Sequence, residues 1–294
     1  MKGIREIKGR IKSVKNTAQI TKAMQLVAAS KMKRAQDSAL AGRPYAILLA
    51  QILFSIREHV EKIDHPLFTE RPVKHRGLLV VSTDKGLCGA LNHNLFRMLG
   101  EVDRDTTRHI CIGRKATQYV SRTGRNLLAD FSVSDKVNFS EVRVVVEYMI
   151  KQYLEGEIDT VEVLYPMFVN SLTQEPRLIK LAPLGANAAE ALAELQKRLK
   201  LDVGDHPVDQ RDMIFEPSAA AILEELPPLF IKQEIYQVIL DAKASEHSAR
   251  MVAMKSATDN AKSLVEDLSL EYNKARQAAI TQEILEIAAA TANN

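Results

Sequence analysis

The chain has 294 residues, of which 26% are charged and 5% aromatic, with no Trp and a formal net charge of only +3. This length allows one large domain or two modest ones. The near balance of charge excludes a polycation that binds nucleic acid along its whole length. Two cysteines, Cys88 and Cys111, are too few for a disulfide framework or a cysteine metal site.

Nothing in the sequence predicts a membrane span or a leader. No stretch reaches the roughly eighteen uninterrupted apolar residues that a spanning helix requires. Met1 leads directly into a helical pattern, so we expect neither a signal peptide nor a transit peptide. We therefore expect a soluble, cytoplasmic chain that reaches a membrane only through partners.

The first 36 residues predict a long basic helix. They carry ten Lys and Arg against one acid, Glu6, and Pro44 is expected to kink a continuation of the helix into residues 45–63. Apolar or small side chains recur at alternating steps of three and four, which is the heptad pattern of a coiled coil. The expected seam consists of Ile4, Ile7, Ile11, Val14, Ala18, Thr21, Gln25, Ala28, Met32 and Ala35.

One part of this helix carries no charge. Residues 23–30, with the sequence AMQLVAAS, form a segment that we call the collar. Its apolar side chains cover more of the helix circumference than one partner helix can hide, and residues 284–290 near the other end of the chain share this property. Such segments must be enclosed, either by a small bundle capped by the segment after Pro44 or by a sleeve of other subunits.

The middle of the chain, residues 75–215, alternates short apolar runs with helical patterns. This alternation predicts a Rossmann-like α/β domain with a mostly parallel sheet, inserted between the terminal helices. Residues 185–207 are expected to form a surface helix and a linker. Strands are expected at 77–82, 109–112, 160–169 and 177–184, the last two adjacent, with helices near 90–99, 115–121 and 140–154.

The last segment predicts a second long helix. Neither Pro nor Gly occurs from Leu229 to Ala290, and we expect the helix to begin at Pro227 and Pro228, after a shorter helical piece at 219–226. Residues 216–290 hold twelve acids against seven bases, opposite in sign to the first helix, which favours an antiparallel coiled coil of the two ends. On this last helix, the seam is expected at Ala257, Ala261, Leu264, Leu268, Glu271, Ala275, Ala278, Gln282 and Leu285.

The predicted fold class is therefore α/β plus a long antiparallel α-helical coiled coil. The expected segments are an N-terminal coiled-coil helix (1–62), an α/β domain (75–215) and a C-terminal coiled-coil helix (216–294).

No catalytic residue, cofactor site or metal site is predicted. The strongest candidate is STDKGLCGALN, residues 82–92, where Gly86 and Gly89 would let backbone amides approach a phosphate at a helix start. The segment lacks both the P-loop and the complete dinucleotide motif, and glycines are common in tight strand-to-helix turns for steric reasons. The seven histidines are scattered and show no ligand spacing.

The basic first helix leaves a second function class open, a coiled-coil nucleic-acid-binding protein, because its ten positive charges could follow phosphates. No aromatic ring occurs before Tyr45, so base stacking is not available to this helix. A charge run is more often a solvated face or a partner surface.

Three motifs in chain order resemble the gamma subunit of F-type ATP synthases. They are ITKAMQLVAASKM near the start, STDKGLCGALN in the middle, and ARMVAMKSATDNA with YNKARQAAITQEILEI near the end. The resemblance covers essentially the whole chain and implies a non-catalytic rotor shaft, present in one copy per complex. The implied partners are three alpha and three beta subunits around the shaft, the epsilon subunit, and the membrane c ring beneath the α/β domain.

The resemblance also implies functional positions. Met24 lies in the collar against the beta subunits. Arg250 is expected near Met24, in the torque-transmitting region of the last helix. Phe215 and Glu216 match the region that faces the c ring and epsilon. Residues that beta-subunit loops would catch are Arg276, Gln277, Thr281 and Glu283.

One feature of the sequence departs from the family pattern, and others narrow the type of organism from which the chain comes. Ala290 and Thr291 stand where relatives usually have a Gly-Ala pair, which we expect to alter fraying of the helix end more than coupling. The chain lacks the cysteine-bearing insertion of chloroplast relatives, so redox control is not expected. A bacterial enzyme at the cytoplasmic face of the inner membrane is the implied setting.

Overall fold

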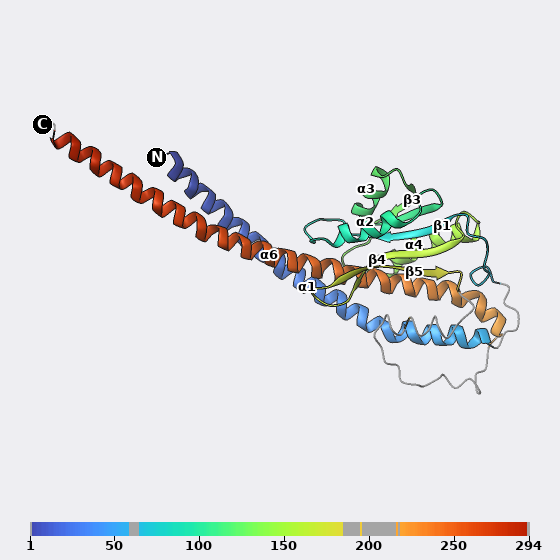
Figure 1. Cartoon of the computed structure of the whole chain (residues 1–294). Helices are drawn as coiled ribbons and strands as arrows, with labels where there is room; N and C mark the ends of the chain where they lie inside the picture. Colours follow the sequence, from blue (N-terminus) through green and yellow to red (C-terminus); the bar gives the residue numbers. More distant parts are fainter. Residues whose placement is uncertain (1, 59–64, 185–194, 196–215, 217, 293–294) are drawn as a thin grey trace. The chain divides into compact units, whose positions relative to one another are not determined.

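The computed structural model describes residues 2–58, 65–184, 195, 216 and 218–292 (Figure 1). Helices and strands alternate through the middle of the chain, and a very long helix stands at each end. The elements are α1 (Lys2–Glu58), β1 (Arg76–Val81), α2 (Leu91–Glu101), β2 (Thr107–Ile112), α3 (Arg114–Arg122), β3 (Asn126–Phe131), α4 (Phe139–Leu154), β4 (Thr160–Phe168), β5 (Gln174–Ala182) and α6 (Ala219–Ala292).

The chain divides into two compact units. One consists of Met1–Ala29 with Arg250–Asn294, and the other is Ser30–Ala249. Both α1 and α6 continue through the division, so each contributes to both units. The segment boundaries expected from the sequence stay a prediction, because residues 59–64 and nearly all of 185–217 lie outside the described residues. The surface helix expected in 185–207 falls in the same gap.

The five strands form one sheet in the order β3-β2-β1-β4-β5. The strands β1 to β4 run parallel, and β5 pairs with β4 in the antiparallel sense. The mostly parallel sheet and the pairing of the last two strands are thus confirmed. The sequence analysis missed β3, an edge strand whose side chains are only half-buried or exposed, because it lacks the continuous apolar run of a central strand.

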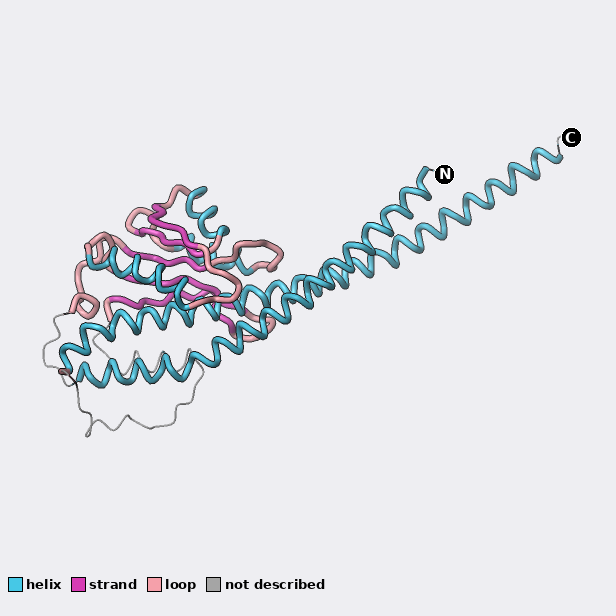
Figure 2. Tube along the Cα trace, turned by 180° about the vertical axis from the view of Figure 1, so that it is seen from behind, coloured by secondary structure: helices cyan, strands magenta, loops and turns pink. Residues whose placement is uncertain are grey.

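Helices cover both faces of this sheet. Strand residues such as Leu78 and Val80 pack with α2 and α3. Their neighbours Leu79 and Val81 face the opposite side and pack with α4 and with the parts of α1 and α6 that belong to this unit. The period of two along β1 therefore divides the core into two layers. Figures 1 and 2 both show α1 and α6 side by side next to the sheet.

The last helix does not begin at its two prolines. Pro227 and Pro228 lie inside α6, which starts at Ala219, and Pro44 lies inside α1. A proline in a helix interior costs about 3 kcal/mol or more, because it removes a hydrogen bond and crowds the preceding turn. Apolar side chains on both sides of the prolines, such as Leu223 and Ile231, are buried in the core. We infer that this packing offsets the cost and keeps the helix continuous.

The sheet contains a buried histidine that should make stability depend on pH. Burial lowers the pKa of His109 from 6.5 to about 4, although its Nδ1 lies 3.0 Å from the carbonyl oxygen of Asn126. The unfolded chain therefore binds this proton more readily than the folded chain. Neutral His109 contributes to the free energy of unfolding in full above pH 6.5. This contribution decreases as the pH falls toward 4, by about 3 kcal/mol in total.

We expect His109→Gln to remove this part of the acid sensitivity. Urea unfolding of the full chain at about pH 7 and about pH 4.5 measures it as a difference between wild type and variant. The titration of Asp159 does not interfere with this comparison between about pH 7 and about pH 4.5. Burial raises the pKa of its carboxyl, but amide hydrogen bonds from His75 and Lys74 and the charge of Arg71 outweigh burial and lower it, so its effect lies at more acid pH. An equal loss of stability in both proteins would contradict the prediction.

Candidate functional site

In the unit of Met1–Ala29 and Arg250–Asn294, α1 and α6 form an antiparallel pair (Figures 1 and 2). On α1, every seam position expected in this unit, from Ile4 to Ala28, is buried or half-buried. This confirms the heptad pattern of the first helix. On α6, the buried and half-buried positions that follow the same steps are Met254, Thr258, Ala261, Val265, Leu268, Tyr272, Ala275 and Ala279.

The expected seam of α6 was correct at some positions and wrong at others. Ala261 and Leu268 are buried and Ala257 and Ala275 are half-buried, as expected, whereas Gln282 and Leu285 are exposed. Leu264, Glu271 and Ala278 are exposed as well. In each of these three cases the next residue along the chain takes the inward position. Seam positions in a heptad are separated alternately by three and four residues. Where the predicted order of the two spacings was reversed, the predicted position falls one residue before the buried one.

The pair contains one buried hydrogen bond between helices. The hydroxyl oxygens of Thr21 and Thr258 lie 2.7 Å apart. Thr258 Oγ1 also lies 2.8 Å from the carbonyl oxygen of Met254, to which it can donate. A buried polar pair in an otherwise apolar seam favours one register, since sliding the helices would separate its two members. With Thr21 opposite Thr258, Ile4 falls opposite Ala275.

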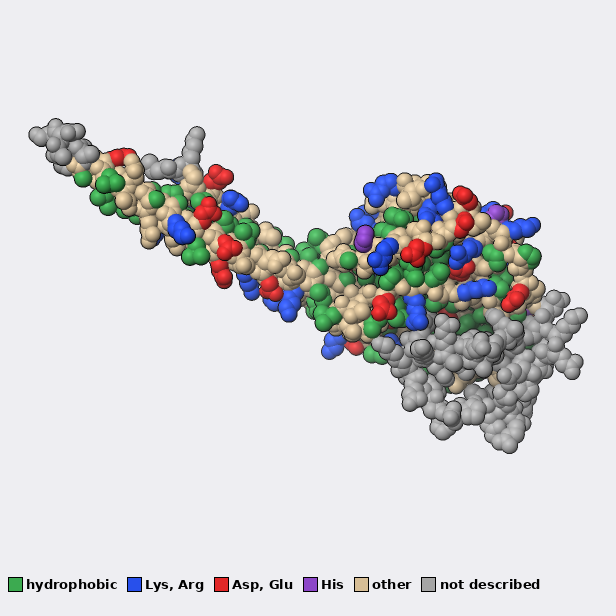
Figure 3. Space-filling view, in the orientation of Figure 1, with side chains coloured by type: hydrophobic (Ala, Val, Ile, Leu, Met, Phe, Trp, Pro, Cys, Tyr) green, Lys and Arg blue, Asp and Glu red, His purple; other side chains and the backbone are tan. Residues whose placement is uncertain are grey.

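The collar presents apolar side chains outward. Leu26 is 60% exposed and Val27 is 56% exposed, and Ile20, which the sequence analysis did not single out, is 60% exposed just before the collar. Met24 is half-buried. The expectation that one partner helix cannot cover the collar is therefore confirmed. Figure 3 shows hydrophobic side chains at the surface of this helical pair.

The last part of α6 extends beyond the start of α1. Because Ile4 lies opposite Ala275, the residues of α6 after about 279 pass the end of the partner helix, and positions 280–288 are all exposed. Apolar side chains are among them, with Ile284 60% and Ile287 66% exposed. The predicted contact residues of this region, all of them exposed on α6, are Arg276, Gln277, Thr281 and Glu283.

The other predicted contact residues lie elsewhere. Arg250 is half-buried at the start of the α6 part of this unit, where the register places it opposite position 29 and more than one turn from Met24. Glu216 is exposed, and Phe215 lies outside the described residues. The structure thus collects four of the eight predicted residues at one end of α6, and Met24 and Arg250 lie farther along the same helical pair.

The STDKGLCGALN segment follows β1 and opens α2, and its polar groups are bonded to the start of another helix, α3. The first amides of α3 are already bonded to it. The amide of Arg114 donates to Asp84 Oδ1 at 3.0 Å, and that of Ala116 donates to Ser82 Oγ at 2.8 Å. The amide of Lys115 donates to the carbonyl oxygen of Thr83 at 3.1 Å. A carboxylate therefore occupies the position at which an anion would bind this helix.

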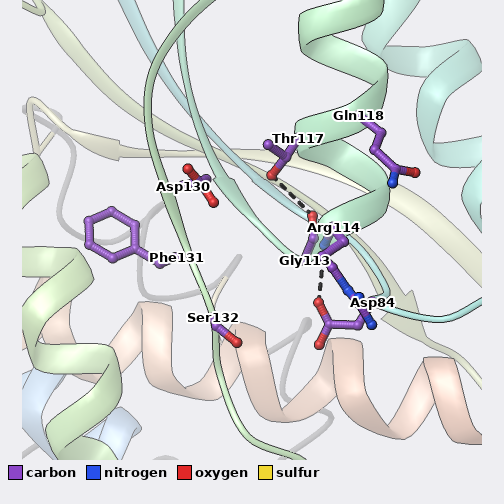
Figure 4. Close-up of a pocket in the computed structure, with 8 residues that line it drawn as sticks. All are labelled: Asp84, Gly113, Arg114, Thr117, Gln118, Asp130, Phe131 and Ser132. Carbon is purple, nitrogen blue, oxygen red and sulfur yellow. Dashed lines mark hydrogen bonds between the residues drawn. The ribbon is translucent and has the colours of Figure 1, made fainter.

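A hollow of about 480 Å³ lies beside this helix start, at the carboxyl ends of β2 and β3 (Figure 4). Two carboxylates, those of Asp84 and Asp130, stand at its wall with Arg114. In Figure 4 the dashed lines join Asp84 to Arg114 and Thr117 to Gly113, so the polar groups bond to the backbone around them. The bonds of Asp84 and Thr117 thus hold the start of α3 beside the hollow.

Neither cysteine has the surroundings of a nucleophile. Burial raises the pKa of the Cys111 thiol to about 12, with a further contribution from the charge of Asp130. Cys88 is buried against Leu91 and Ala249.

Among the described residues, no group of three or more His, Cys, Asp or Glu side chains could hold a metal ion. In the same part of the chain, no helix has the length and hydropathy needed to cross a membrane.

Comparison with known proteins gives consistent results. The gamma chain of ATP synthase from Opitutus terrae is 53% identical over 290 residues, which cover 99% of this chain and 98% of that one. The gamma chain from Methylacidiphilum infernorum is 48% identical over 292 residues and 97% of each chain. In a structure of the Euglena gracilis mitochondrial ATP synthase (OSCP/F1/c-ring, rotational state 3), a chain superposes with a TM-score of 0.66 at 18% identity, covering 97% of this chain and 92% of that one. The family model described as ATP synthase matches residues 3–293, and the chain belongs to this family.

Proposed function

We propose that the chain is the central rotor shaft of an F-type ATP synthase, a non-catalytic subunit that couples ion-driven rotation of the membrane c ring to ATP synthesis. The observation that carries the proposal is the outward-facing apolar surface of the helical pair, from Ile20 to Val27 on α1 and from Ile280 to Ile287 on α6. Apolar surface of this kind requires a surrounding partner. The relatives named as gamma chains, such as the one at 53% identity over 290 residues, support the ring of alpha and beta subunits as that partner.

The collar would serve as a bearing. A shaft that turns inside three equivalent pairs of subunits must have similar contacts at every angle. Uncharged side chains such as Leu26 and Val27 give weak contacts that change little with angle. A buried ion pair would favour one angle by several kcal/mol and so oppose rotation. Each angle of an asymmetric shaft would then stabilise open or closed catalytic subunits differently, which is how rotation reaches the nucleotide sites.

The predicted contact residues have distinct parts in this proposal. Met24 would contact the moving domain of the beta subunits. The exposed cluster at the end of α6, Arg276, Gln277, Thr281 and Glu283, would be held by loops of the beta subunits. Arg250 would act in torque transmission, at the start of the α6 part of the same unit.

The α/β domain would form the foot of the rotor. Phe215 and Glu216 would face the c ring and the epsilon subunit, and the chain would be a peripheral protein at the cytoplasmic face of a bacterial inner membrane. It would take part in one copy per three alpha and three beta subunits, with no cofactor of its own. The coupling ion, H⁺ or Na⁺, would be selected by other subunits.

Affinity purification of the tagged chain from native membranes tests this function. We expect a large ATP-hydrolysing complex in which the chain is present once per three alpha and three beta subunits, measured by quantitative mass spectrometry and an ATPase assay. Recovery of RNA or DNA instead would favour the nucleic-acid alternative. Recovery of the chain alone as a compact monomer would contradict the rotor function.

A further inference from the structure

One segment of α6 is buried on every side. All eight residues from Ala242 to Ala249 are buried, which in a helix means more than two complete turns without a solvent-exposed face. The segment is nevertheless rich in polar groups, because Lys243, Ser245, Glu246, His247 and Ser248 are among these residues. A helix with this composition is normally half-exposed, so its surroundings must supply polar partners.

Three loops of the α/β domain contact this segment. They are residues 82–90 after β1, 132–138 after β3 and 169–173 after β4, and we call them the clasp. Because β1, β3 and β4 run parallel, all three loops leave the same edge of the sheet. In an open α/β sheet this carboxyl edge is where ligands usually bind. In this chain the edge holds the protein's own helix.

Each loop makes a defined contact. The first loop packs Cys88 against Ala249. The third loop accepts a hydrogen bond of 2.8 Å from Ser248 Oγ at the carbonyl oxygen of Ser171. These contacts lie on neighbouring residues of α6, so both loops hold the helix at the same level.

The second loop contributes a charge that joins both long helices. Asp135 lies 2.5 Å from Lys31 Nζ on α1 and 3.9 Å from both Lys243 Nζ and His247 Nε2 on α6. Lys243 also lies 3.6 Å from Glu246. Burial raises the pKa of Asp135, but the hydrogen bond from Lys31 and the charges of Lys243, Lys31 and His247 outweigh burial and lower it. Asp135 is therefore an ionised link between α1 and α6.

Side chains brace the loops from within. In the first loop, Asn92 Nδ2 donates to Thr83 Oγ1 at 2.7 Å. In the second, the amide of Ser134 donates to Glu141 Oε2 at 3.1 Å. In the third, Asn170 Oδ1 accepts from the amide of Thr173 at 2.9 Å. Loops with such internal bonds resist deformation when the helix that they hold is loaded.

We propose that the clasp fixes the root of the shaft, with Asp135 as a positioning residue that links both helices to the α/β domain. This inference rests on the proposed rotor function. The division of the chain into its two units falls between Ala249 and Arg250, directly after the clasped segment, and between Ala29 and Ser30, two residues before Lys31. The clasp thus lies where the helices leave the α/β domain, and this is the point at which rotation of the foot must pass into the shaft.

Coupling under load tests the clasp. In the complex assembled from this organism's own subunits and placed in vesicles, Asp135→Ala should leave ATP hydrolysis in the presence of an uncoupler nearly unchanged. The steady-state ion gradient that hydrolysis sustains should fall about two- to tenfold, because a loosened root allows slip against the load. The gradient is followed as proton or sodium uptake.

Two further variants make the outcome specific. Asp135→Glu keeps the carboxylate and should restore most of the gradient. Glu157→Ala removes a carboxylate that pairs with Arg108 at the start of β2, at the opposite edge of the sheet, and should behave as wild type. A gradient in Asp135→Ala equal to that of wild type would overturn the proposal, as would an equal fall in uncoupled hydrolysis. A wild-type complex without hydrolysis or pumping would contradict the proposed function itself.

Discussion

Leu26→Lys should reduce ATP synthesis by about tenfold or more while the amount of assembled complex stays normal. The side chain of Leu26 is 60% exposed in the chain itself, so a lysine there does not disturb the helical pair. Inside a surrounding sleeve of subunits, the charge would be desolvated at some angles of the shaft and paired at others, which adds a barrier to rotation. An added barrier of about 1.4 kcal/mol slows rotation tenfold. ATP synthesis by inverted membrane vesicles, together with immunoblots of the assembled complex, measures both quantities.

The matched control is Asn16→Lys, which adds the same charge to an exposed position in the basic stretch before the collar. It should leave synthesis nearly unchanged. A substitution at Met24 would test the bearing less directly. Met24 is half-buried, so a lysine there would also alter the packing between the two helices. Normal synthesis by a fully assembled Leu26→Lys complex would show that the collar is not a bearing.

Gly113→Ala should destabilise the α/β domain by about 3 kcal/mol or more. Gly113 precedes α3 with a φ of +92°, and a Cβ placed there would lie 2.3 Å from the carbonyl oxygen of Ser82. Both the backbone conformation and the space therefore require glycine. Ser82 begins the first loop of the clasp, so its displacement would also loosen the bonds between this loop and α3.

Urea unfolding of the full chain, followed by circular dichroism, measures this change. Gly86→Ala serves as the control, since a Cβ there would meet no atom within 4 Å. We expect it to unfold at nearly the wild-type urea concentration. Equal stability of the two variants would mean that the tight approach at Gly113 relaxes without cost.

The sequence was most informative where a single physical rule decides the structure. Alternating apolar steps of three and four predicted the α1 seam from Ile4 to Ala28, since only one face of that helix can be covered by a partner. The central strands were visible as apolar runs because both of their faces are buried. The collar was recognisable because its apolar side chains extend around more of the helix than one partner helix can cover.

The missed features depend on tertiary surroundings. The edge strand β3 ends in Ala129, Asp130 and Phe131, a pattern that short loops share. Pro227 and Pro228 predicted the beginning of a helix, but packing on both sides keeps α6 continuous through them. The polar composition of residues 242–249 is typical of an exposed helix, and its burial depends on tertiary contacts, among them those of the three loops.

The same limit applies to the predicted contact residues. Arg276 and Thr281 share an exposed region at the end of α6. Their contact with loops of the beta subunits stays a prediction. The ionised link at Asp135, which is itself exposed, gave no signal in the sequence, because a lone aspartate in a Ser-rich loop is usually a solvated turn residue.

Direct observation of rotation tests the central claim most closely. The complex of this chain with its alpha and beta subunits is fixed to a surface through the beta subunits, and a bead is attached to a cysteine introduced at Lys136 in the α/β domain. The account predicts that ATP turns the bead in one direction in three equal steps per revolution, as threefold equivalent catalytic sites require. A bead that stays fixed while the complex hydrolyses ATP at its normal rate would contradict the account.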